Sequence, residues 1–122
     1  MLQDEIQSFG RRLGLEGLSL GESGIAALEI EQVGTLTLEM GEGSAEESLL
    51  MTLAAPPRPA DAAQRYRLAL ERLDWRRGAP AIAAGLHRDR LILCARLPAS
   101  SLSEADLDRA LRALMENMSA LG

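Results

Sequence analysis

The sequence predicts an α+β protein in which one twisted antiparallel sheet is flanked by helices. Two observations predict this class. Segments with alternating apolar and polar residues are grouped together, and amphipathic segments with helical spacing lie at both ends of the chain and between the strands. We expect the element order αβββαββα within a single domain, residues 1–122, because 122 residues suit one domain of ordinary size.

The first segment with helical spacing spans residues 2–13, with acidic residues in its first turn and arginines in its last, as the helix dipole favours. One stripe of this segment carries the apolar residues Leu2, Ile6, Phe9 and Leu13. Four glycines between residues 14 and 24 predict turns.

Three strands are predicted next, over residues 25–31, 33–40 and 48–54. The second alternates most clearly, with Leu36 and Leu38 between threonines, and the third is apolar on both faces. Because short links join the three, they predict an antiparallel meander.

Prolines at positions 56, 57 and 59 end the third strand and lead into a helix over about residues 60–74. Tyr66, Leu70 and Leu73 share one stripe of this helix, and we expect that stripe to be buried. Leu68 and Trp75 lie off the stripe.

Two further strands are predicted over residues 79–86 and 90–97, joined by a turn at 87–89, and the last helix runs to about residue 120. Ser101 has capping-box spacing to Glu104, with Ser103 as an alternative cap.

Composition argues against several classes of function. The net charge of −5 opposes binding to phosphate backbones, and an aromatic content of 2% leaves little for base stacking. The first residues lack a basic region followed by an apolar run, so we expect no signal peptide, and no apolar run approaches the length of a membrane span. With a single cysteine, the sequence predicts a soluble, cytoplasmic protein that binds neither nucleic acid nor membranes.

No residue pattern favours catalysis. His87 is the only histidine and falls in a predicted turn, whereas Cys94 lies within a predicted strand, where burial is its usual role. Because the chain contains no lysine, it has no Walker motif. We therefore expect no enzyme activity, no metal site and no cofactor.

The apolar residues are more numerous than one small domain needs for its core. The third strand is apolar on both faces, and residues 79–84 are small enough for close packing with another backbone. Because exposed apolar patches usually mark partner surfaces, we expect a homodimer that binds other polypeptides.

Residues 12–30 carry a family resemblance. Leu13-Gly14-Leu15 ends the first helix, Leu18-Ser19-Leu20 follows, and an acidic turn with glycine at 22–24 precedes a strand with Leu28 to Ile30. This order resembles the class I chaperones of bacterial type III secretion, the effector chaperones related to the Tir chaperone family. The final helix, residues 107–118, matches that family in place and length.

The resemblance implies a homodimer in the bacterial cytoplasm that binds the N-terminal segment of a secreted effector in extended form. The effector would be kept soluble and ready for secretion, and a contact with the secretion ATPase is left open. By position, the effector groove would comprise Ile6, Phe9, Leu13, Leu15, Leu18, Leu20, Leu28, Leu36 and Leu38, although alternation cannot sort core from groove among them. The dimer interface would comprise Leu68, Trp75, Ala81 and Ala83.

Two alternatives remain at this point. A roadblock/longin-like dimer that regulates a GTPase has a similar size, but its second helix usually follows two strands and not three. An enzyme of unknown type would lack any candidate residue.

Overall fold

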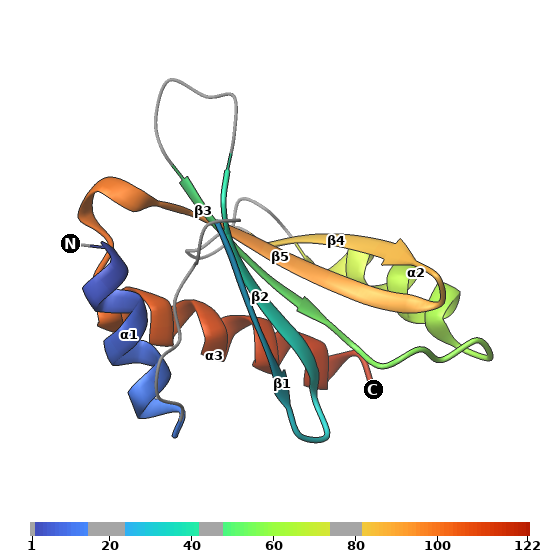
Figure 1. Ribbon diagram of the computed structural model, residues 1–122. Coiled ribbons are helices and arrows are strands. Elements are labelled where there is room, and N and C mark those ends of the chain that lie inside the picture. Colours follow the sequence, from blue (N-terminus) through green and yellow to red (C-terminus); the bar gives the residue numbers. More distant parts are fainter. Residues whose placement is uncertain (1, 15–23, 42–47, 74–81) are drawn as a thin grey trace.

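The computed structural model describes residues 2–14, 24–41, 48–73 and 82–122, and its element order is the one that the sequence predicts (Figure 1). The described elements are α-helices, β-strands and one short 3₁₀ helix. In chain order they are α1 (Leu2–Arg12), β1 (Ile25–Ile30), β2 (Gly34–Met40), β3 (Ser48–Ala54), α2 (Ala62–Arg72), β4 (Ile82–His87), β5 (Arg90–Pro98), η1 (Ala99–Ser101) and α3 (Glu104–Ala120).

The five strands form one antiparallel sheet in the order β1-β2-β3-β5-β4. The first three make the predicted meander, and β5 then returns beside β3, which leaves β4 at the far edge. One row of paired residues crosses all five strands on the same face, namely Leu28, Leu36, Leu53, Leu93 and Ala84.

That face forms the hydrophobic core. Helices α2 and α3 pack against it, and α1 packs against α3 (Figure 1). Fully buried strand residues alternate with more exposed ones along β2, β3 and β5, as expected for strands covered on one side. Ile6 and Phe9 of α1 belong to the same buried cluster as Leu36 and Leu38.

The buried stripe of α2 differs from the predicted one. Leu70 is 56% exposed, and the most deeply buried residues are Ala62, Arg65 and Ala69. These positions have the i, i+3, i+7 spacing of one helix face. Tyr66 and Leu73 of the predicted stripe are half-buried and pack against the same core, so that prediction is wrong at Leu70.

Helix α3 begins at the alternative cap, Ser103, and not at Ser101. The Asp106 N–H donates to Ser103 Oγ at 3.2 Å, and the Ser103 N–H donates to Asp106 Oδ2 at 2.9 Å, which completes a capping box. The Asp106 carboxylate accepts hydrogen bonds from both the N–H and the Oγ of Ser103, and these bonds, followed by the charge of Arg109, lower the pKa of Asp106. The first turn of α3 is also tied to α1, because the Glu104 N–H donates to Glu5 Oε2 at 2.7 Å.

Both described hairpin turns use left-handed backbone. Gln32 has φ 66° between β1 and β2, and Arg88 and Asp89 have φ 50° and 62° between β4 and β5. His87 is the last residue of β4, so the predicted turn at 87–89 narrows to two residues. Gly34 has φ 144°, and a side chain there would collide with the Ala54 carbonyl of β3.

Candidate partner-binding edges

Strand β1 is one edge of the sheet and is paired on one side only within the described part of the chain. The Met40 N–H donates to the Gly24 carbonyl, so Gly24 and Met40 form a hydrogen-bonded pair. Because such pairs alternate in antiparallel strands, Ile25, Ala27 and Glu29 direct their N–H and C=O groups away from β2. Their side chains are exposed on the face opposite the helices. The edge therefore offers a row of main-chain donors and acceptors.

Strand β4 is the opposite edge. Its two-residue turn with left-handed Arg88 and Asp89 closes on a hydrogen-bonded pair, His87 and Arg90. By the same alternation, Ile82, Ala84 and Leu86 direct their main-chain groups outward. Their side chains lie on the helix-covered face, and α2 contacts β4.

Large apolar side chains are exposed at a few described positions. Leu70 of α2 is 56% exposed and Leu86 of β4 is 40% exposed, so both elements at the β4 edge carry apolar surface. Ile25 of β1 is 44% exposed, and Leu13 after α1 is 36% exposed. The sequence analysis missed Leu70, Leu86 and Ile25. Leu70 shares a helix stripe with half-buried residues of α2, and Leu86 shares a strand face with half-buried residues of β4. Sequence spacing therefore predicts burial for both, and only the packing of α2 on β4 reveals that they are exposed.

The predicted effector-binding residues separate into three groups. Ile6, Phe9, Leu36 and Leu38 are 0% exposed and belong to the core, so they offer no surface to a partner in this fold. The reason is that α1 packs against α3 and buries Ile6 and Phe9 in the core cluster, while β2 turns its leucines toward the helices. Leu28 is half-buried and Leu13 is exposed. Leu15, Leu18 and Leu20 lie outside the described residues.

The predicted dimer residues are only partly described. Leu68 is half-buried on α2, and Ala83 is exposed on β4. Trp75 and Ala81 lie outside the described residues.

The two residues considered for catalysis, His87 and Cys94, differ in exposure and lie on different strands. His87 is exposed at the end of β4, and Cys94 is half-buried, with Thr52 Oγ1 3.4 Å from its Sγ. In the described ranges, no three His, Cys, Asp or Glu side chains are grouped so as to hold a metal ion. None of the helices in those ranges is long and apolar enough to cross a membrane.

Comparisons with known proteins give both a family and a fold. The model of the Tir chaperone protein (CesT) family matches residues 5–121. No curated protein has a sequence that matches this chain.

Solved structures with the same fold include chains from three protein complexes. The structure of the Yersinia pestis type III secretion chaperone SycH with a stable fragment of YscM2 has a TM-score of 0.71 and 20% identity, over 100% of both chains. A chain of the ExsC–ExsE complex has a TM-score of 0.69 and 21% identity, over 96% of this chain and 87% of that one. A chain of the heterodimeric ExoU–SpcU complex from the type III secretion system of Pseudomonas aeruginosa has a TM-score of 0.62 and 19% identity, over 95% and 93%.

Proposed function

We propose that this chain, which belongs to the Tir chaperone protein (CesT) family, binds the N-terminal segment of a type III secretion effector in extended form at the β1 edge. The effector would thereby stay soluble and competent for secretion. The same-fold structures named above include a chaperone bound to a fragment of another protein. The family consists of effector chaperones, and we propose the β1 edge as the surface of this chain that contacts the effector.

The outward main-chain groups of β1 carry this proposal. An extended peptide can add to a sheet edge by main-chain hydrogen bonds, with side-chain pockets supplying specificity. Ile25, Ala27 and Glu29 present such groups, and Ile25 adds exposed apolar area beside them. Because main-chain hydrogen bonds are indifferent to sequence, this edge suits segments of varied sequence.

Apolar contacts would supplement the strand pairing. Of the predicted effector-binding residues, Leu13 and Leu28 keep accessible surface and remain proposed contacts, as do Leu15, Leu18 and Leu20 outside the described residues. The effector segment would lose most of the conformational entropy, since the chaperone sheet is already formed.

The β4 edge suits the homodimer. There α2 and β4 together expose Leu70 and Leu86, and Leu68 and Ala83 lie on the same two elements. A two-fold dimer buries one patch against its own copy, so a surface made of a helix and a strand can serve both protomers. Trp75 and Ala81 remain proposed members of this interface.

The alternatives are weaker. Neither the family model nor the structures named above support the roadblock/longin-like dimer. We propose that the chain is not an enzyme and that it acts in the bacterial cytoplasm, because its family is one of chaperones for proteins that await secretion. A contact with the secretion ATPase is left as a further proposal.

Amide hydrogen exchange in the purified effector complex tests the site. Exchange at the amides of Ile25, Ala27 and Glu29 should slow when the effector segment binds. The amides of Ala26 and Leu28 already donate to β2 and serve as internal controls. A stable complex in which the three outward amides exchange as fast as in the free chaperone would refute strand addition at β1.

A further inference from the structure

Arg65 is a buried cation without a matched acceptor. Its side chain on α2 is only 7% exposed, yet within the described part of the chain Nε and Nη1 have no hydrogen-bond partner. Its Nη2 lies 3.7 Å from the sulfur of Met118, which is a weak acceptor. Burial lowers the pKa of Arg65, and nearby Arg58 lowers it further, against the opposing effect of Asp61. A buried charge in this condition is destabilising unless something pairs with it.

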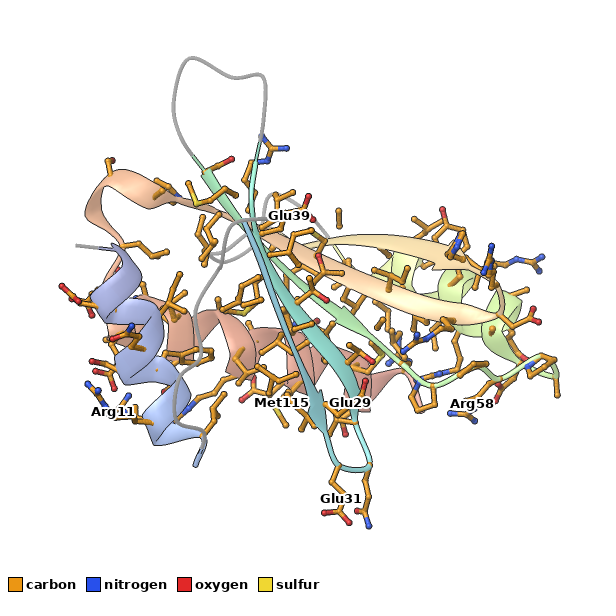
Figure 2. The ribbon with its side chains drawn as sticks, viewed as in Figure 1. Arg11, Glu29, Glu31, Glu39, Arg58 and Met115 are labelled. Atoms are coloured by element: carbon orange, nitrogen blue, oxygen red, sulfur yellow. The ribbon has the colours of Figure 1, made fainter. Side chains whose placement is uncertain are left out.

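The Arg65 side chain lines a pocket of about 480 Å³ between the β1–β2 turn, the exit of β3, and helices α2 and α3. Its apolar lining comes from Val33, Ala55, Pro56, Met115 and Met118. Arg58 also lines it and is held in place, because its Nη1 donates to the Gly122 carbonyl at 2.7 Å and its Nη2 to Asp61 Oδ2. Figure 2 labels Met115 on α3 and Arg58 on the segment that follows β3.

The charges at this pocket favour a monoanion. Arg58 is paired with Asp61 and also donates to the Gly122 oxygen, whereas the buried Arg65 guanidinium makes no ion pair among the described residues, which leaves one positive charge without a partner. A carboxylate matches that charge and can accept two parallel hydrogen bonds from the planar guanidinium. A dianionic phosphate would meet the repulsion of Asp61.

The methionines allow such a ligand to enter. Met118 contacts Arg65, and Met115 lines the same pocket. Methionine is unbranched and adapts its shape readily, so Met118 can move from the guanidinium as an anion approaches. The apolar lining would then contact the rest of the ligand.

We propose that this pocket binds a carboxylate carried on an apolar body, with the carboxylate paired to Arg65 and the apolar part against Met115 and Met118. The inference does not depend on effector binding at β1.

Methyl NMR with hexanoate as the probe tests the proposal on the intact wild-type protein. The chain has five methionines, of which Met115 and Met118 line the pocket while Met51 lies in the core. Hexanoate should shift the ¹³C-methyl signals of Met115 and Met118 saturably and leave Met51 unchanged. Hexanamide, the uncharged analogue, and inorganic phosphate should cause no comparable shift.

Two substitutions assign the effect to Arg65. Arg65→Leu should weaken hexanoate binding by about tenfold or more, because it removes a charge-assisted contact. Arg96→Leu is the matched control, since Arg96 is an exposed arginine on β5. The Arg96→Leu variant should bind hexanoate with the affinity of the wild type.

The effector complex distinguishes two sources of the carboxylate. If a bound polypeptide supplies it, the two methyl signals are already shifted in the complex and hexanoate adds nothing. If a free small molecule supplies it, hexanoate still binds the complex. The proposal is overturned if wild-type Met115 and Met118 do not respond to hexanoate, if hexanamide or phosphate produces the same shifts, or if a folded Arg65→Leu variant binds as well as the wild type.

Discussion

The two edges of the sheet expose their main chain in opposite ways. At β1, the residues with outward main-chain groups carry their side chains on the face opposite the helices. At β4, the corresponding residues carry theirs on the helix-covered face, where α2 contacts the strand. A peptide that pairs with β1 therefore meets a strand alone, whereas a partner at β4 meets a strand and a helix together. This difference is why we assign β1 to an extended segment and β4 to a second folded copy.

Among the described residues, neither edge strand carries the outward charges or prolines that protect most sheet edges. Edge strands usually carry outward charges or prolines that discourage pairing with other chains. β4 holds no acidic residue, lysine or arginine. The one carboxylate of β1, on Glu29, accepts a hydrogen bond from Thr35 Oγ1 of β2, so it lies back along the sheet. Both edges thus favour pairing, and partner binding would cover them.

The largest expected effect separates the core from the proposed effector contacts. Phe9→Ala should lower the free energy of unfolding by about 3–5 kcal/mol, because Phe9 is fully buried and its loss leaves a cavity. Chemical denaturation measures this change. Leu13→Ala is the control, since Leu13 is partly exposed and should lose far less. If Phe9→Ala kept wild-type stability and lost only effector binding, Phe9 would belong to the effector site after all.

The β4 edge is tested by charge. We expect Leu70→Asp and Leu86→Asp each to raise the dissociation constant of the homodimer by about 30-fold or more when the residue is a hot spot. Each substitution would place a carboxylate in the proposed apolar interface, and the variant tested carries both. Sedimentation equilibrium gives the dissociation constant. Ile25→Asp, at the other edge, should leave the dimer intact. An unchanged dimer in the double variant would move the interface away from α2 and β4.

The β1 edge is tested through its main chain. Ala27→Pro should weaken effector binding by about tenfold, because proline removes one outward donor, and edge positions tolerate proline best. Ala27→Val keeps that donor and is the matched control. Titration calorimetry with the effector segment measures both. Equal affinities for the two variants would mean that the segment does not pair with β1.

Local pattern predicted the strands well and the contacts poorly. Residues 48–54 were predicted as a strand and are β3 to the residue, because alternation and flanking turns are local signals. Alternation also placed Leu36 and Leu38 on one face, but it does not reveal which face the helices cover. The same limit applies to α2. There Ala62, Arg65 and Ala69 are buried while Leu70 is exposed, and the helical spacing alone does not reveal how the helix is rotated about its axis against the sheet.

The smallest effect concerns the tie between α1 and α3. Ser103→Ala removes the cap of α3 and should lower the free energy of unfolding by about 1 kcal/mol. Two contacts join the same turn of α3 to α1. The Glu104 N–H donates to Glu5 Oε2, and Arg12 Nε pairs with Glu104 Oε1 at 2.9 Å. Loss of the cap should therefore speed amide exchange in α1 while β4 stays protected. Faster exchange at β4 as well would mean that the two edges are not independent.

The same variant should change how stability depends on pH. The capping hydrogen bonds lower the pKa of Asp106 in the folded state, whereas an unfolded aspartate titrates near about 3.9. Between these two pKa values the unfolded chain binds more protons, so stability rises with pH there. The contribution is fully present above about pH 3.9 and is lost as pH falls through the folded pKa. Ser103→Ala removes the side-chain bond to Asp106, so its stability should fall less steeply over this acidic range. Identical slopes for the variant and the wild type would show that the capping hydrogen bonds do not set the titration of Asp106.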